Sequence, residues 1–191
     1  MRAPARTAVV VPIKSFELAK GRLAEVMTAQ ARAALAKRCA EAVLRAASPL
    51  AVFVVCDDEQ VASWAHSNGA TVVAAVRPGL NEAAAAGRAA ALAAGCERVL
   101  VVHSDLPMPE PLAPLADEPG DVVIVPDRHR DGTNALLVPA SGEFAFRYGR
   151  GSFAAHQAEA AARGLAVTVA SRPDLALDLD TPDDLAAAGL I

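Results

Sequence analysis

The sequence predicts a three-layer α/β/α fold with a mostly parallel central sheet. Short Val-rich runs alternate with Ala-rich segments along the chain, and β-branched residues favour strands whereas alanine favours helices. Alternating strands and helices are typical of βαβ units, which place helices on both faces of a parallel sheet. The 191 residues are enough for one sizeable core. We therefore expect residues 1–191 to form a single domain.

The first half of the chain predicts a strand, a loop, and then helices that alternate with strands. A β-branched run from Thr7 to Val11 indicates a buried strand, and a charged loop follows from Ile13 to about Val26. Thr28 can cap the next helix, which carries an apolar stripe. The ranges expected here are helices at 28–47, 58–68 and 81–94, and strands at 51–56, 71–76 and 98–103.

The second half predicts further strands around one longer helix. Strands are expected at 121–125, 134–138, 165–170 and 176–180, and a helix from Ser152 to Arg163, which Gly164 ends. A last helix begins after Thr181, because a threonine cap, a proline at the first helical position and two acids in the first turn form a strong start signal. Those acids, Asp183 and Asp184, are therefore assigned to capping.

Composition excludes several classes of function. The formal net charge of −4 gives no footprint for DNA or RNA, although local basic clusters could bind a small anion. The three cysteines lack Cys-x-x-Cys spacing, which favours structural thiols in a reducing, cytosolic compartment. No signal-peptide pattern is present, and no stretch approaches the roughly 20 apolar residues of a membrane span. We expect a soluble, cytoplasmic protein that binds neither nucleic acid nor membrane.

Three aspartates follow or end predicted strands. Asp178 and Asp180 alternate with leucines, so in an extended strand both carboxylates project to one side while the leucines enter the core. Asp105 comes soon after the strand at 98–103. Ligands of α/β sheets bind beyond the carboxyl ends of the strands, and clustered carboxylates suit Mg²⁺, which usually holds phosphates. These acids indicate a Mg²⁺ site; the alternatives are a turn at Asp105 and an exposed strand face at the other two.

The loop after the first strand is basic. It carries Lys14, Lys20 and Arg22 where a triphosphate could lie, and lysine and arginine both suit phosphate oxygens. The loop has neither a Walker A pattern nor a Gly-x-Gly-x-x-Gly fingerprint, so a P-loop and a Rossmann dinucleotide site are not supported. The alternative is a solvated basic loop.

Two further segments carry polar groups near predicted element starts. A tight turn at 131–132 would leave the Thr133 hydroxyl free at the start of a strand. Glycines at 149 and 151 precede a helix and could form an anion-binding nest, although Ser152 is also a good N-cap. The four histidines show no metal spacing; His156 is expected to be an ordinary helix residue, and no Ser/His/Asp relay is supported.

Taken in order, these motifs resemble the guanylyltransferases of coenzyme F420 biosynthesis, also described as 2-phospho-L-lactate or phosphoenolpyruvate guanylyltransferases. The resemblance covers nearly the whole chain and implies a nucleotide-diphospho-sugar transferase-like nucleotidyltransferase fold. Each motif is weak alone, and the ordered set is specific. The motifs are VVPIK at 10–14, KGRL at 20–23, SDLP at 104–107, DGTNAL at 131–136, YG at 148–149 with Ser152, and LDLDTPDDL at 177–185.

The resemblance implies transfer of GMP from GTP to the phosphate of a three-carbon acid, with release of pyrophosphate. The bacterial branch uses phosphoenolpyruvate and the archaeal branch 2-phospho-L-lactate, and the Ala- and Arg-rich composition favours the bacterial acceptor. An anionic phosphate needs no activated nucleophile, so the enzyme must supply alignment and charge neutralisation. The product implies a transient hand-off to the downstream F420 transferase.

The resemblance also implies roles for individual residues. Asp105, Asp178 and Asp180 would hold Mg²⁺, and the three basic residues of the first loop would hold the triphosphate of GTP. The acceptor would bind at Thr133, Gly149 and Ser152, with the glycine chosen over Gly151 on its spacing from the serine. Asn81 would contact the nucleotide, or else cap its helix.

Two other functions remain open at this point. The first is a nucleotidyltransferase acting on molybdopterin or a sugar phosphate, against which the absence of a Gly-rich first loop argues. The second is a non-catalytic nucleotide-binding module, against which the three acids and the basic loop argue together.

Overall fold

A seven-stranded sheet forms the centre of the protein. The computed structural model describes residues 6–190, and its strands lie in the order β3-β2-β1-β4-β6-β5-β7. Among these strands β6 alone is antiparallel to its neighbours, so the prediction of a mostly parallel sheet is confirmed. The strands are β1 (Thr7–Pro12), β2 (Ala51–Cys56), β3 (Thr71–Ala74), β4 (Arg98–Val102), β5 (Val122–Pro126), β6 (Thr133–Pro139) and β7 (Val167–Val169).

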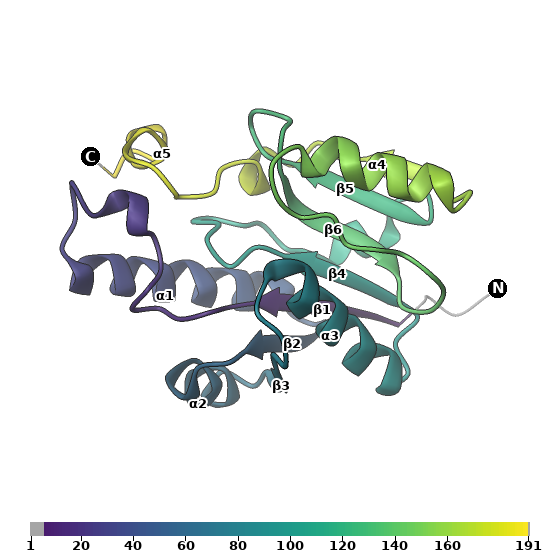
Figure 1. Ribbon diagram of the computed structural model, residues 1–191, viewed down its shortest axis with the longest axis horizontal. Coiled ribbons are helices and arrows are strands. Elements are labelled where there is room, and N and C mark those ends of the chain that lie inside the picture. The colour runs from purple at the N-terminus through teal and green to yellow at the C-terminus, as the bar shows by residue number, and fades with distance from the viewer. Residues whose placement is uncertain (1–5, 191) are drawn as a thin grey trace.

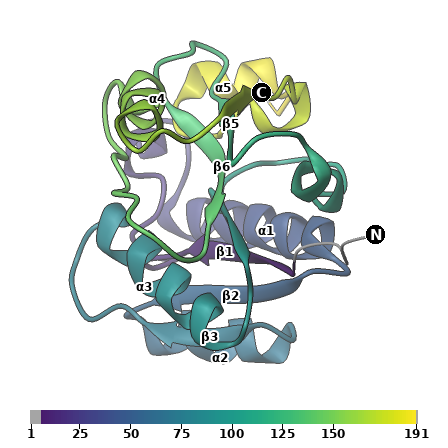
Figure 2. The same cartoon turned by 90° about the vertical axis from the view of Figure 1, so that its right-hand side faces the viewer.

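Helices cover both faces of this sheet, as predicted (Figures 1 and 2). Alternate strand residues face opposite layers: Val9 and Val11 join a core with α1 and α2, whereas Ala8 and Val10 join a core with α3 and α4. This alternation is the period of two expected of a strand buried on both sides. The helices are α1 (Ala29–Ala47), α2 (Glu59–Ser67), α3 (Leu80–Ala93), α4 (Ser152–Ala162) and α5 (Pro182–Ala187), with short 3₁₀ turns at Gly21–Leu23, Ala113–Asp117 and Pro173–Leu175.

Close packing fixes α3 against the sheet. Gly87 lies against Val10 and Val55, where an added Cβ would come within 2.3 Å and 2.9 Å of their side chains. The next residue, Arg88, is buried, and its guanidinium donates to five backbone carbonyls of residues 139–144 at 2.8–3.1 Å. Through Arg88, α3 therefore holds the segment that leads to the glycines before α4.

One edge of the sheet gathers most of the chemically active residues. The six mutually parallel strands end at this edge, and the antiparallel β6 begins there with Thr133. Loops after β1, β4 and β5 therefore meet the start of β6 and the segment before α5. Figure 1 shows this arrangement on the side where β1 points, below α5.

Three details of the predicted elements were wrong. Residues 176–180 form no strand; they cross the sheet edge with only isolated backbone bonds, such as Leu179 N–H to the Asp105 carbonyl at 3.2 Å. Asn81 does not cap α3, since Gly79 takes that position. Ser152 is the first residue inside α4, and Gly151 with a left-handed φ of 71° precedes it as the cap.

The predicted cap of the last helix is confirmed. Thr181 and Asp184 form a capping box at the start of α5. Within residues 6–190, the structure contains no helix long and apolar enough to cross a membrane.

Candidate active site

The three predicted acids lie together at the sheet edge. Asp105, Asp178 and Asp180 each offer a carboxylate oxygen, and these oxygens lie within 4.8 Å of one another. The loop after β4 supplies the first, and the segment between the last 3₁₀ turn and α5 supplies the other two. The structure thus brings together residues that are more than 70 positions apart in the chain.

The segment that carries Asp178 is held from β6 and not by a strand ladder. Asn134 is buried, and its side-chain amide donates to the Leu175 carbonyl at 2.9 Å and to Asp178 Oδ1 at 3.3 Å. Because this amide fixes one oxygen of the Asp178 carboxylate, the other oxygen stays available for a ligand. Asp178 and Asp180 therefore lie in the same cluster although residues 176–180 do not form the predicted strand.

Lys20 supplies the positive charge nearest to these acids. Its Nζ lies 3.3 Å from Asp105 Oδ2 and 3.8 Å from Asp180 Oδ1, and its side chain is only 3% exposed. Lys20 also has a left-handed φ of 57°, which is costly for a residue with a Cβ. Arg22 lies farther out: it is 76% exposed and reaches Asp180 at 3.9 Å, a distance at which an exposed pair contributes little stability.

The acids have the electrostatics of a cation site. Burial raises the pKa of Asp178 and of Asp180 above the ordinary value, and the nearby Asp105 charge raises both further. Asp105 Oδ1 is buried and has no hydrogen-bond partner among residues 6–190. A hard divalent cation prefers oxygen ligands. Such a cation would neutralise the repulsion among the three carboxylates and would coordinate the unpartnered Asp105 oxygen. The residues present therefore fit a divalent metal.

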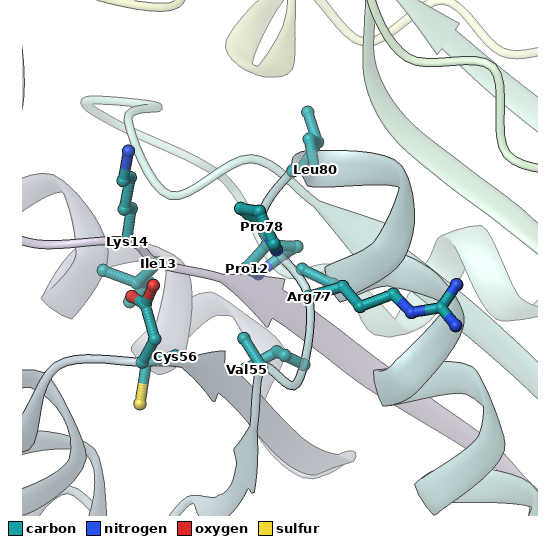
Figure 3. A pocket seen from close by; sticks show the side chains of 12 residues that line it. Pro12, Ile13, Lys14, Val55, Cys56, Arg77, Pro78 and Leu80 are labelled. Carbon is teal, nitrogen blue, oxygen red and sulfur yellow. The ribbon is translucent and has the colours of Figure 1, made fainter.

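Two adjoining cavities run from the acids along the ends of the first strands. One, of about 280 Å³, is lined by Lys14, Lys20, Asp105 and Asp180 among others. The second, of about 270 Å³, lies beyond the ends of β1, β2 and β3 and is lined mainly by apolar groups with Asp57 and Arg77 (Figure 3). Both cavities are lined by Ile13 and Lys14, so they lie next to each other at the sheet edge.

Thr133 and Ser152 lie side by side, but their hydroxyls are not free. Both residues are buried, and Ser152 Oγ donates to Thr133 Oγ1 at 3.4 Å. His156, fully buried in α4, has Nδ1 3.0 Å from the same oxygen, and its Nε2 accepts the Arg147 N–H at 2.9 Å. The expectation of a free Thr133 hydroxyl was therefore wrong. His156 lies inside a helix as expected, and its two ring nitrogens join β6 to the segment before α4.

The glycines before α4 have the expected backbone conformations. Gly149 and Gly151 both have positive φ values, of 133° and 71°. The Gly151 N–H, however, already donates to Asp131 Oδ2 at 3.2 Å, and Ser152 N–H donates to the Gly149 carbonyl. In this structure the anion at the start of α4 is the side chain of Asp131.

Asn81 acts on the protein itself. Its amide donates to the Tyr148 carbonyl at 3.2 Å, and its Oδ1 accepts the Tyr148 N–H at 2.6 Å. These two bonds clamp the segment that carries Gly149 onto α3. Asn81 therefore lies beside the segment that leads into α4. Its side-chain hydrogen bonds within residues 6–190 go to Tyr148 and not to any of the three acids.

Sequence reasoning assigned no role at this edge to Asn134, His156 or Arg128. It assigned Asp184 to helix capping and did not foresee its contact with another loop. Arg128 Nη2 donates to Asp184 Oδ1 at 2.6 Å, which links the loop after β5 to α5. Two of the four stood inside motifs already singled out, DGTNAL and TPDD. The others depend on contacts between distant segments, for which a single sequence carries no signal.

The comparisons with known proteins agree with this geometry. A family model described as "Guanylyl transferase CofC like" matches residues 7–190. A phosphoenolpyruvate guanylyltransferase from Rubrobacter xylanophilus is 40% identical over 93% of this chain and 90% of the relative, and one from Conexibacter woesei is 40% identical over 95% and 86%. A 3-phospho-D-glycerate guanylyltransferase from Colwellia psychrerythraea is 30% identical over 97% and 92%.

Solved structures support the fold. A protein from Desulfovibrio desulfuricans described as a nucleotide-diphospho-sugar transferase has a TM-score of 0.78 at 17% identity, over 96% of this chain and 86% of that one. A 4-diphosphocytidyl-2C-methyl-D-erythritol synthase from Anaerococcus prevotii has a TM-score of 0.63 at 11% identity, over 97% and 95%. The predicted nucleotide-diphospho-sugar transferase-like fold is confirmed.

Proposed function

The chain belongs to the CofC-like guanylyl transferase family, and we propose that it transfers GMP from GTP to phosphoenolpyruvate and releases pyrophosphate. A phosphate oxygen of the acceptor attacks the α-phosphorus of GTP, and a new P–O bond forms. The bond from that phosphorus to the bridging oxygen of the β-phosphate breaks, and its electron pair leaves with pyrophosphate. The observation that carries the proposal is the cluster of Asp105, Asp178 and Asp180 beside the buried Lys20.

The three aspartates are the residues that we propose to hold Mg²⁺. A bound Mg²⁺ would neutralise charge on the phosphates and stabilise the pyrophosphate leaving group. Oxygen-only ligands favour this hard cation over softer metals. Asn134 would keep the Asp178 carboxylate oriented, and Lys20 would place one further positive charge next to the reacting phosphates.

The two adjoining cavities suit the two parts of a nucleotide. We assign the apolar cavity at the ends of β1, β2 and β3 to the nucleoside, and the polar cavity with Lys20 to the triphosphate. Lys14 lies where the two meet, and in Figure 3 its side chain extends away from the sheet. Arg22 lies at the exposed rim of the acidic cluster, where it can meet an arriving polyanion.

For the acceptor we propose the edge formed by Thr133, Gly149 and Ser152. The polar groups there are hydroxyls and a helix N-terminus, which favour an anion. The Asp131 carboxylate bonded to Gly151 N–H illustrates the preference, and a phosphorylated acid would compete with it. Asn81 supports this edge by holding Tyr148, and the nucleotide contact suggested by the sequence stays a prediction.

A pyrophosphate-release assay tests the proposed function. It crosses GTP and ATP with phosphoenolpyruvate, 2-phospho-L-lactate and 3-phosphoglycerate, in the presence and absence of Mg²⁺. We expect the highest kcat/KM with GTP, phosphoenolpyruvate and Mg²⁺. A preference for 3-phosphoglycerate would reassign the acceptor within the family, and the absence of pyrophosphate release with all three acids would contradict the proposal.

The proposed reaction fits a step of coenzyme F420 biosynthesis, the pathway of the family that the sequence resembles. The product would pass to the downstream transferase by a transient hand-off. All proposed site residues come from one sheet edge, which supports a single nucleotidyltransferase domain over residues 1–191. The three cysteines are free and buried, which supports a reducing, cytoplasmic location.

A further inference from the structure

The carboxylate of Asp184 makes more bonds than a helix cap requires. In a capping box the acid bonds the backbone N–H of the cap residue, and Asp184 Oδ2 does accept the Thr181 N–H at 2.7 Å. The same oxygen also accepts the Asp180 N–H at 3.1 Å and the Thr181 hydroxyl at 2.7 Å. It therefore holds the backbone of an acid of the candidate metal cluster.

The second oxygen of Asp184 ties this arrangement to a different part of the fold. Oδ1 accepts from Arg128 Nη2 at 2.6 Å, and the Arg128 N–H donates to the Ala176 carbonyl at 2.7 Å. Asp184 is buried, and the bonds to Thr181 and Asp180 and the Arg128 charge keep its pKa low in spite of burial. Arg128 thus bonds residues on both sides of the Asp178–Asp180 segment, Ala176 before it and Asp184 after it.

These contacts matter because the segment has no sheet of its own. Asp180 is not in a strand, and its side chain is 42% exposed, so the ladder does not fix its backbone. The backbone bond from Asp180 to Asp184 directly fixes the residue from which its carboxylate projects. Partners that orient a metal ligand in this way commonly change metal affinity 10- to 100-fold when removed.

We propose that Asp184, with Arg128 as its counter-charge, is a positioning residue for Asp180 in metal binding. The proposal rests on the metal site of the proposed function. It assigns Asp184 a role in the site, in addition to its role as a helix cap.

The test measures Mn²⁺ binding by electron paramagnetic resonance at 15 °C, after circular dichroism at the same temperature has been used to check that each variant is folded. We expect Asp184→Ala to weaken Mn²⁺ binding about 10- to 100-fold, and Arg128→Met to weaken it less. The matched control is Asp183→Ala, which removes an exposed acid from the same helical turn and should leave the affinity unchanged. A second control, Leu185→Ala, disturbs the packing of α5 through a buried leucine and keeps the side chain that accepts the Asp180 N–H.

The outcomes separate this proposal from the proposed function. If Asp178→Ala binds Mn²⁺ as tightly as the wild type, the metal site itself is wrong. If Asp178→Ala loses binding while Asp184→Ala retains it, the metal site stands and the positioning role is overturned. Equal losses in Asp184→Ala and Leu185→Ala would reduce Asp184 to a structural cap and would also overturn it.

Discussion

Acidification should destabilise this protein through one buried side chain, His156. Its Nε2 accepts the Arg147 N–H, so the ring must be neutral, with its proton on Nδ1 facing Thr133. Burial, and to a smaller extent the neighbouring His103 and Arg147, lowers the pKa of His156 from 6.5 to about 4. Between these two pH values His156 is protonated in the unfolded chain and neutral in the folded protein.

The sign follows from that difference. Because the unfolded state binds more protons, the free energy of unfolding rises with pH between about 4 and 6.5. The contribution of His156 to that free energy is therefore complete above this range. At about 1.4 kcal/mol per pKa unit, the contribution is roughly 3 kcal/mol. This is a large share of the 5–15 kcal/mol typical of a native protein.

Urea unfolding at pH 7.0, 6.0, 5.0 and 4.5 measures this contribution. The wild type is compared with His156→Gln, which cannot titrate in this range, and with His66→Gln, which removes an exposed histidine. We expect the pH dependence of His66→Gln to match the wild type and that of His156→Gln to be flatter by most of the calculated amount. Acidic groups titrate in all three proteins, so the comparison cancels them. Parallel pH profiles for wild type and His156→Gln would refute the argument.

Three further predictions concern the acids and α3. Asp178→Asn should raise the Tm of the metal-free protein at pH 7. Burial and Asp105 raise the pKa of Asp178, and a buried acid with a raised pKa makes the folded protein less stable as pH increases. A lower Tm would contradict this. Gly87→Ala should cost about 1–3 kcal/mol in urea unfolding, since its Cβ overlaps Val10, and Gly21→Ala, with open space around its Cβ and no positive φ, is the control for an added methyl group. Arg88→Leu should cost at least about 2 kcal/mol, because buried carbonyls lose a charged donor; an unchanged urea midpoint would contradict it.

The fold was predictable because the local sequence signals for strands and helix starts agree with the elements that the protein forms. Short apolar runs, most of them Val-rich, marked all seven strands, and the predicted cap at Thr181 was confirmed. The false strand at 176–180 shows the limit of that approach. Alternating Leu and Asp mimics a half-buried strand, but Leu179 enters a small cluster with Leu23 and Leu185 beside α1, and no neighbouring strand pairs with the segment.

The site was predictable only in part, for the same physical reason. Asp105, Asp178 and Asp180 could be grouped because strand ends meet at one sheet edge, and the structure brings them together. The side chains that hold them could not be found in this way. Asn134 and Arg128 act across gaps of 44 and 56 residues, and such pairings depend on how loops cross the edge.

The acceptor side shows a second limit. The sequence could suggest hydroxyls and glycines at the starts of β6 and α4, but not how they bond within the unliganded protein. Thr133 Oγ1 is engaged by His156, and the Gly151 N–H donates to Asp131, so both groups already have partners within the protein. These internal partners follow from packing of the loops, which residue type alone does not determine.

The central claim, attack by the acceptor phosphate on the α-phosphorus of GTP, can be tested directly with phosphoenolpyruvate carrying ¹⁸O in its phosphate. We predict that one ¹⁸O appears on the GMP-derived phosphorus of the product, seen as an isotope shift in its ³¹P NMR signal, and that the released pyrophosphate is unlabelled. A GMP-derived phosphorus without ¹⁸O, or label in the pyrophosphate, would contradict the account.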